Sequence, residues 1–288
     1  MISVPLLGIV FALLAALSSG VEKLLRKKVA INVDALTFAF FFELIGAVFA
    51  FPLFIANFNL PEINWAWWLV LVSGFLWAGV AFTMVKSYKH LEASFIAPVS
   101  RSRIILILIL SVIFLSETLN FNKIAGTSLV FAGLVFLSYK KGVNFSRLKE
   151  EGMIHLILSI VFISAVFIVD KFAVNFFNPS MYTFMIYFTA SVILLPGIFS
   201  KKEDIKHIVK SKFILLIILT AALSVLYYYF TLAAFKFAEA SVILPITELS
   251  SLVAVFGGIF FLNERTDIKK KIVSTIIIIA GVVLISLS

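Results

Sequence analysis

The sequence predicts an all-α polytopic membrane protein with ten transmembrane helices, arranged as an inverted repeat of five helices plus five. Hydrophobic residues make up 62% of the 288 residues and charged residues only 14%, and the mean hydropathy is +1.14. A soluble domain carries roughly 25% charged residues, so lipid must cover the surface of this chain. The apolar residues form continuous runs rather than alternating ones, which favours helices over barrel strands. An internal repeat is the third observation.

Ten apolar runs are long enough to cross a bilayer, which takes roughly 17 to 25 helical residues. In chain order, the runs cover residues 4–20, 35–56, 65–85, 93–115, 124–139, 153–169, 181–199, 213–235, 240–262 and 272–287. Each run ends where polar or charged residues begin, as at the basic clusters that follow the first, third and fifth runs. The connections are short and polar, and none is long enough to form a separate soluble domain.

The two halves of the chain repeat each other at a nearly constant offset, which indicates a duplication. The aligned segments are LEASFIAPVSRS at 91–102 with AEASVILPITEL at 238–249, FLSETLN at 114–120 with FLNERTD at 261–267, and VEK at 21–23 with VDK at 169–171. The expected domains are 1–142 and 152–288. Each holds five helices, an odd number, so the second must enter the membrane in the opposite direction. Such inverted repeats place a binding site near the bilayer midplane between the halves.

The repeated segment also resembles a known family. In both halves E-A-S-x-x-x-P is followed one helix later by L-x-E-x and a final apolar helix, which resembles the EamA domain of the drug/metabolite transporter superfamily. The family usually has glycine before the acidic residue, where this chain has Ser116 and Asn263. The resemblance covers essentially the whole chain as two tandem copies. It implies a plasma-membrane carrier or exporter of small metabolites that is not an enzyme.

The formal net charge of +9 comes from lysines and arginines in short clusters between the apolar runs. This distribution indicates membrane topology rather than a nucleic-acid-binding face. The chain has no cysteine, no P-loop and only three scattered histidines without metal-ligand spacing. We therefore expect no nucleic acid, metal, cofactor or resident ATPase.

The orientation in the membrane can be predicted from the same charges. Nineteen of the 24 Lys and Arg residues lie in or beside the loops after the first, third, fifth, seventh and ninth expected helices. The opposite side carries only Lys123, Lys171 and Lys236. The positive-inside rule places the 19-charge side in the cytoplasm and both termini outside. The family resemblance implies both termini inside, so the two arguments leave the orientation open.

Arg101 and Glu248 occupy equivalent positions, because the offset of 147 residues carries one onto the other. Each lies about nine residues into its run, and therefore about 12 Å below its own face of a hydrocarbon core of roughly 30 Å. The two charges are then about 6 Å apart in depth, which an arginine side chain can bridge. Deep charges in a bilayer face internal cavities and mark substrate pathways. We predict that this pair belongs to a substrate-binding site, with a structural or snorkelling pair as the alternative.

Arg103 lies two residues beyond Arg101, which is about 200° around a continuous helix. It is therefore expected on the opposite face, paired with Glu43 of the second helix. This pair is interpreted either as a structural pin or as a further part of the substrate-binding site. Glu117 and Glu264 lie at helix ends, where they are expected to cap helices or pack loops rather than bind a ligand.

Two prolines and three tyrosines complete the predicted substrate-binding residues. Pro98 and Pro245 each precede the deep charge by three residues, where a missing N–H frees backbone carbonyls and kinks the helix. Tyr227, Tyr228 and Tyr187 lie deep in the eighth and seventh helices, and a buried phenol needs a hydrogen-bond partner. At most two of the three consecutive tyrosines that begin at Tyr227 can face the same space.

The leading hypothesis is a secondary-active carrier that exports a small polar or zwitterionic metabolite, such as an amino acid, by alternating access of the two five-helix bundles. Protons are a candidate coupling ion, through Glu43 and Glu248. The expected partners are a small-molecule substrate and membrane lipid, and the expected state is a monomer or weak homodimer. A flippase for a lipid-linked sugar or lipid phosphate is the alternative within transport. An intramembrane enzyme is the alternative of another class.

Overall fold

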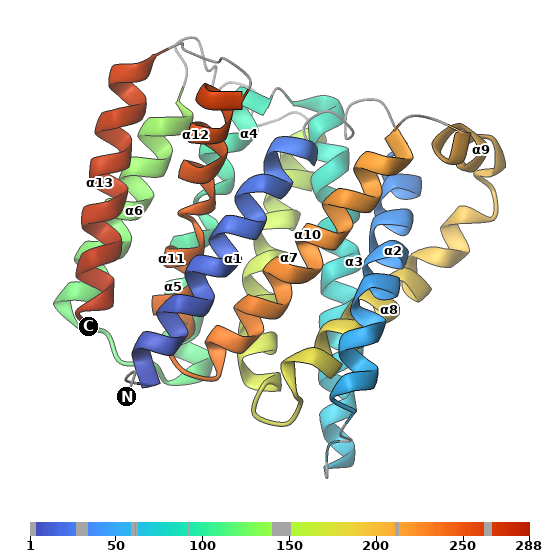
Figure 1. Ribbon diagram of the computed structural model, residues 1–288, viewed down its shortest axis with the longest axis horizontal. Coiled ribbons are helices and arrows are strands. Elements are labelled where there is room, and N and C mark those ends of the chain that lie inside the picture. Colours follow the sequence, from blue (N-terminus) through green and yellow to red (C-terminus); the bar gives the residue numbers. More distant parts are fainter. Residues whose placement is uncertain are drawn as a thin grey trace.

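The computed structural model describes residues 4–26, 34–58, 61, 63–91, 93–139, 151–210, 213–261 and 267–288, and every regular element in these ranges is a helix (Figure 1). The first half contains α1 (Val4–Arg26), α2 (Ala35–Ala56), the 3-10 turn η1 (Asn64–Ala66), α3 (Trp67–His90), α4 (Ala93–Ser100), α5 (Arg103–Leu115) and α6 (Phe121–Ser138). The second half contains α7 (Glu151–Ala173), α8 (Pro179–Leu194), η3 (Leu195–Ile198), α9 (Lys202–Lys210), α10 (Phe213–Phe235), α11 (Ala240–Thr247), α12 (Ser250–Phe261) and α13 (Ile268–Ser286). The predicted all-α fold is confirmed.

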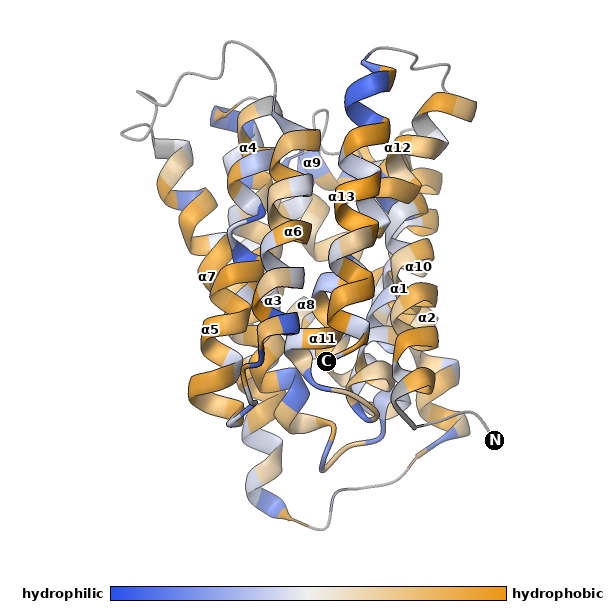
Figure 2. Ribbon diagram, turned by 90° about the vertical axis from the view of Figure 1, so that its left-hand side faces the viewer, coloured by the Kyte–Doolittle hydropathy of each residue, from blue (hydrophilic) through white to orange (hydrophobic). Residues whose placement is uncertain are grey.

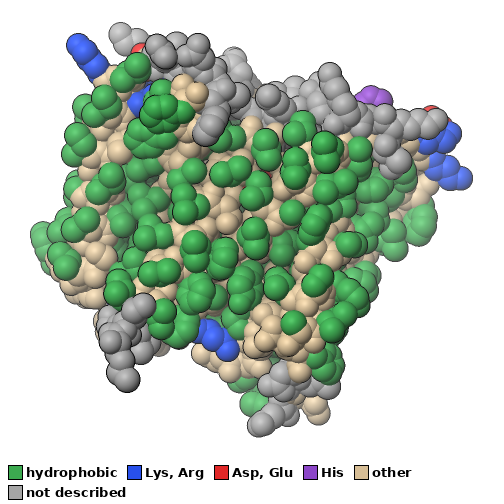
Figure 3. All heavy atoms as spheres, in the orientation of Figure 1, with side chains coloured by type: hydrophobic (Ala, Val, Ile, Leu, Met, Phe, Trp, Pro, Cys, Tyr) green, Lys and Arg blue, Asp and Glu red, His purple; other side chains and the backbone are tan. Residues whose placement is uncertain are grey.

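Nine helical stretches of the described chain are long and apolar enough to cross a membrane. The tenth pass, α13, has 19 residues and carries three lysines in its first turn. Apolar residues make up most of the long helices (Figure 2), and hydrophobic side chains cover most of the visible face between its charged edges (Figure 3). Large side chains such as Phe75 and Phe114 are more than half exposed. Lipid is the solvent that such a surface requires.

The main helix pairs all join the first repeat to the second. Helix α1 packs along α10, α3 along α7, α2 along α8 and α6 along α13. Exchanging the two repeats converts the first pair into the second and leaves the other two pairs unchanged, as a pseudo-two-fold axis requires. The α6–α13 pair packs through glycines: a Cβ added at Gly126 would lie 2.6 Å from the carbonyl oxygen of Gly281. Small residues of this kind allow membrane helices to approach closely.

The predicted continuous helices 93–115 and 240–262 are wrong in the same way. The first is broken at Arg101 into α4 and α5, and the second is broken at Glu248 into α11 and α12. The N–H of Arg101 donates to Pro98 O and the N–H of Glu248 donates to Pro245 O, both over 3.2 Å. These are single tight turns to the residue three positions earlier, which end the regular helix. The breaks place both deep charges at half-helix ends.

The molecule has two faces that differ in their connections. We call the basic face the side that carries the α1–α2, α3–α4, α6–α7, α8–α10 and α12–α13 connections, and the terminal face the side where both chain ends lie (Figure 1). On the basic face, Asp34 caps α2 by accepting hydrogen bonds from the N–H groups of Leu36 and Thr37, both over 3.1 Å. Burial opposes ionisation of this carboxyl, but the hydrogen bonds from Thr37 and Lys201 lower the pKa of Asp34 below its usual value.

Helix α9 was not predicted, because its nine residues are mostly polar or charged and too few to cross a bilayer. Helix α1 also extends beyond the predicted end at residue 20, as far as Arg26. Glutamate, lysine, leucine and arginine are good helix formers, so the charged segment that follows the apolar run continues the helix towards the basic face.

Candidate functional site

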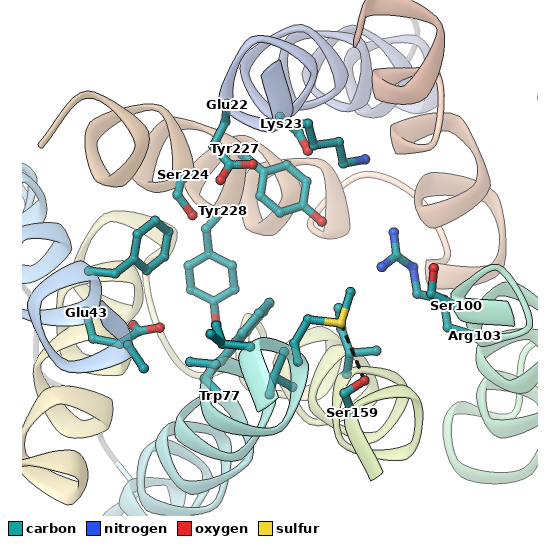
Figure 4. A pocket seen from close by; sticks show the side chains of 18 of the residues that line it. Glu22, Lys23, Glu43, Trp77, Ser100, Arg103, Ser159, Ser224, Tyr227 and Tyr228 are labelled. Atoms are coloured by element: carbon teal, nitrogen blue, oxygen red, sulfur yellow. Dashed lines mark hydrogen bonds between the residues drawn. The ribbon is translucent and has the colours of Figure 1, made fainter. Parts of the chain in front are cut away.

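A cavity of about 420 Å³ lies between the two repeats (Figure 4). Its charged lining residues are Glu22, Lys23, Glu43, Arg103 and Glu248. Both repeats contribute to the wall. The volume is within the range of small-molecule sites, which is roughly 300–1,000 Å³.

The cavity lies in the half of the protein nearer the basic face. Lys23 is in the last turn of α1, Glu43 is in the first half of α2, Tyr88 is in the last turn of α3, and Ser159 is in the first half of α7. All four helix segments lie on the side of the α1–α2 and α3–α4 connections. A small molecule in the cavity would therefore approach from the basic face.

Glu248 binds two arginines at the junction of the broken helices. Nη1 of Arg101 donates to Oε2 of Glu248 over 2.8 Å, and Nε of Arg103 donates to Oε1 over 3.1 Å. The Nη2 group of Arg103 contacts the same Oε1 atom. Nζ of Lys23 donates to Oγ of Ser250 over 2.6 Å, two residues beyond Glu248. These contacts bring together three cationic side chains and one carboxylate, so positive charge exceeds negative charge on this side of the cavity.

The prediction that Arg101 and Glu248 meet is confirmed, and the prediction that Arg103 pairs with Glu43 is wrong. The expected 200° separation of Arg101 from Arg103 assumed a continuous helix, whereas α4 ends before Arg101 and α5 begins at Arg103. The break turns both arginines towards Glu248. Glu43 lies on the opposite wall of the cavity from Arg103 (Figure 4).

The predicted tyrosines all border the cavity. Tyr187 donates to Oγ of Ser224 over 2.8 Å, and Tyr227 extends its ring towards the centre of the cavity (Figure 4). Tyr228 donates from the cavity wall to Oδ2 of Asp170 over 2.8 Å. Among the described residues, Tyr229 is not part of the lining, as expected for three consecutive helix positions.

Pro98, Pro245 and Arg101 do not belong to the lining among the described residues. The two prolines act on the cavity indirectly, because each precedes the turn that breaks its helix. Arg101 lies behind Glu248 and is bonded to it. Arg103 and Lys23 are therefore the cationic side chains that can contact a substrate in this cavity. We call the side of the cavity that these two residues line the cationic wall.

A family model described as the EamA-like transporter family matches residues 6–139 and again residues 151–287. The chain belongs to the EamA-like transporter family. This agrees with the resemblance read from the repeated motifs and makes the protein a multi-pass membrane transporter. The comparison with curated proteins finds no match.

This EamA-like transporter is similar to a solved structure described as "Crystal structure of protein". The match covers 97% of the transporter chain and 96% of the chain in the solved structure. The TM-score is 0.78 and the sequence identity is 13%. At this identity the likeness shows the fold alone.

Three charged residues that the structure places in or beside the cavity of the EamA-like transporter were not predicted from the sequence as site residues. Glu22 and Lys23 line it, and Asp170 bonds to Tyr228 of its wall. The signal was present, because VEK at 21–23 aligns with VDK at 169–171. Charged residues at equivalent positions in two membrane repeats are costly to keep and mark functional positions.

On the terminal face of the EamA-like transporter, polar contacts join the two repeats. Glu117 accepts hydrogen bonds from the first N–H groups of α11, at Ala240 over 2.7 Å and at Ser241 over 3.0 Å. Lys123 forms an ion pair with Glu239 at the same helix start. The predicted capping role of Glu117 is confirmed, whereas Glu264, its equivalent in the second repeat, lies outside the described residues.

The lining suits a ligand that carries charge. Within the described ranges, no group of three or more His, Asp or Glu side chains is arranged to hold a metal ion. The cavity instead offers guanidinium and ammonium donors from Arg103 and Lys23, and carboxylate acceptors from Glu22 and Glu43. Trp77 and Tyr228 supply aromatic edges between them, with ring centroids 5.4 Å apart. Such a cavity can hold a small molecule by charge-assisted hydrogen bonds and apolar contact.

Proposed function

We propose that the protein is a secondary-active carrier that exports a small zwitterionic metabolite, such as an amino acid, by alternating access. The observation that carries this proposal is the opposite charge of two opposite cavity walls, with Arg103 on one and Glu43 on the other (Figure 4). A zwitterion presents a carboxylate and an ammonium group, and each meets a group of opposite charge in such a cavity.

The cationic wall has an excess of positive charge that can bind a substrate carboxylate. Arg101 and Arg103 share one carboxylate, Glu248, and Lys23 is bonded to the neutral hydroxyl of Ser250. A substrate carboxylate beside Arg103 and Lys23 would offset the remaining positive charge, and charge-assisted hydrogen bonds of this kind are the strongest in proteins.

The size of the cavity favours a metabolite over the headgroup of a lipid-linked sugar. Its volume of about 420 Å³ lies at the lower end of the range for small-molecule sites. The positive-inside rule assigns the basic face to the cytoplasm, and the cavity lies nearer that face. Loading from the cytoplasm corresponds to export.

The inverted repeat supports alternating access through two equivalent lysines. Lys171 of α7 donates to the carbonyl oxygens of Phe235 and, over 2.9 Å, Ala238, at the end of α10 on the terminal face. Its equivalent in α1, Lys23, instead lies in the cavity. The segment YKHLEAS at 88–94 aligns with FKFAEAS at 235–241, so the matching carbonyls belong to Tyr88 and Leu91 at the end of α3. In the opposite state, Lys23 moves to this helix end, where the helix dipole favours a cation, and Lys171 is released.

Thermal unfolding of the purified protein against a panel of the common amino acids and isoprenoid phosphates tests the proposed substrate class. An amino acid at about 100 times its Kd should add about 2.7 kcal/mol to the free energy of unfolding, which is a Tm rise of roughly 5 °C for a chain of this size. Arg103→Gln should lose this rise, and Glu203→Gln on the exposed helix α9 should keep it. A rise with isoprenoid phosphates and none with amino acids would favour the flippase.

A further inference from the structure

We propose that Asp170 of α7 is the proton-binding site that couples substrate export to a proton gradient. This inference rests on the proposed carrier function and adds a coupling ion and its site. The sequence placed a proton site at Glu43 or Glu248, but Glu248 is neutralised by two arginines in direct contact. An ion pair favours the charged carboxylate and makes Glu248 a poor proton acceptor.

Asp170 is fully buried, and its hydrogen-bond partners in the described part of the chain are all neutral. Its Oδ1 atom accepts hydrogen bonds from the hydroxyls of Ser73 over 2.5 Å and Tyr182 over 3.0 Å. Its Oδ2 atom accepts from the hydroxyl of Tyr228 over 2.8 Å and from Nε1 of Trp77 over 3.3 Å. The carboxyl has an exposed fraction of 0% and lies within the span from Gly152 to Ala173.

No cation compensates this carboxyl among the described residues. The titratable groups that face it are Tyr182 from α8 and Tyr228 from α10, and α3 adds Ser73 and Trp77. Within the described ranges, α4, α5 and α11, which also contact α7, provide no charged group that bonds to it. The neighbouring Lys171 directs its Nζ to backbone carbonyls at the terminal face. An uncompensated charge buried inside a protein costs several kcal/mol, and one proton removes the charge.

The shell of Asp170 can serve both protonation states. Three of its four partners are hydroxyls, which donate to a carboxylate and can rotate to accept from a carboxylic acid. Only Nε1 of Trp77 is restricted to donating. A shell of lysines or backbone N–H groups would favour the ionised form alone, whereas this one loses no partner when the proton arrives.

Tyr228 and Trp77 connect the proton site to the substrate cavity, because both line the cavity and both bond to Asp170. A proton from the cavity can bind the phenol oxygen of Tyr228 while its own proton passes to Oδ2 of Asp170. The net change is one new O–H bond on Asp170, and Tyr228 ends with its O–H bond restored. A substrate that moves either aromatic ring therefore changes the environment of the carboxyl.

Asp170→Asn in proteoliposomes separates coupling from transport, because the amide has the size of the protonated acid but cannot titrate. The probe is a ¹⁴C-labelled amino-acid mixture, measured as counterflow without a pH gradient and as accumulation with one. For one proton per substrate, a gradient of one pH unit drives about tenfold accumulation. We expect wild type to show both activities, and Asp170→Asn to keep counterflow within about twofold while losing accumulation. Glu203→Gln should behave as wild type.

Three results would overturn or redirect the proposal. Accumulation by Asp170→Asn at the wild-type level places the proton elsewhere, and loss of counterflow in this variant shows a need for Asp170 in transport itself. Absence of counterflow in wild type contradicts the carrier function instead. If Asp170→Asn does not fold, proton release by wild type on addition of the amino-acid mixture is compared with that of Tyr182→Phe. Tyr182→Phe removes one hydrogen-bond donor from the Asp170 carboxylate, which should move the pH midpoint of proton release about one unit higher. An unchanged midpoint would contradict the assignment of the proton site to Asp170.

Discussion

Glu248→Gln is expected to destabilise the protein by about 3–5 kcal/mol, the usual cost of removing one partner from a buried ion pair. The change leaves Arg101 and Arg103, whose side chains are only 13% and 18% exposed, without their carboxylate partner. A guanidinium cannot lose its proton to escape burial. Arg101→Gln should cost clearly less, because Glu248 keeps Arg103 and a carboxylate can be neutralised by a proton.

Thermal unfolding in detergent and the yield of monodisperse protein measure this difference. The triple variant Arg101→Gln/Arg103→Gln/Glu248→Gln should recover most of the lost stability, because no uncompensated charge remains, but should not transport. Glu203→Gln is the matched control, because it makes the same chemical change at a side chain that is 86% exposed. Equal Tm values for Glu248→Gln and wild type would show that the cluster does not stabilise the fold.

Glu117→Gln is expected to open the terminal face, because it weakens two charge-assisted hydrogen bonds to the start of α11. Such bonds contribute about 1.5–3 kcal/mol each, and a loss of 1.4 kcal/mol shifts a two-state equilibrium about tenfold. The chain has no cysteine, so Ala81→Cys in the cavity lining provides a single label site. A membrane-impermeant maleimide should reach it from the basic face in the parent protein.

In the Glu117→Gln background, labelling of the same cysteine from the terminal face should rise at least tenfold. Labelling from the basic face should fall in parallel, because one cavity cannot open to both sides in alternating access. Glu203→Gln in the same Ala81→Cys background should leave both rates unchanged. Equal labelling from both faces in every variant would indicate a channel rather than a carrier.

The ten passes could be predicted because membrane helices are long apolar runs, and the α2 and α10 bounds agree with the predicted runs. The contact between Arg101 and Glu248 could also be predicted, because the repeat placed them at equivalent depths. The helix breaks could not, since the apolar run continues through both of them. A proline three residues earlier permits a break but does not require one.

The environment of Asp170 could not be predicted from sequence. Its four donors come from α3, α8 and α10 and are separated from it by between 12 and 97 residues. Ser73 and Trp77 reach Asp170 only because α3 packs along α7 across the two repeats. The partner of Arg103 was wrongly predicted for a related reason, because the rotation of a side chain around a helix can be counted only while the helix is continuous.

Counterflow in proteoliposomes tests most directly whether the cavity binds and carries a zwitterion. Vesicles loaded with an unlabelled amino-acid mixture and diluted into the ¹⁴C-labelled mixture should show a transient overshoot of internal label with the wild-type protein. Arg103→Gln should abolish the overshoot, and Glu203→Gln should retain it. Uptake no greater than in protein-free vesicles would contradict the proposed amino-acid carrier, and an undiminished overshoot with Arg103→Gln would contradict the proposed role of the cationic wall.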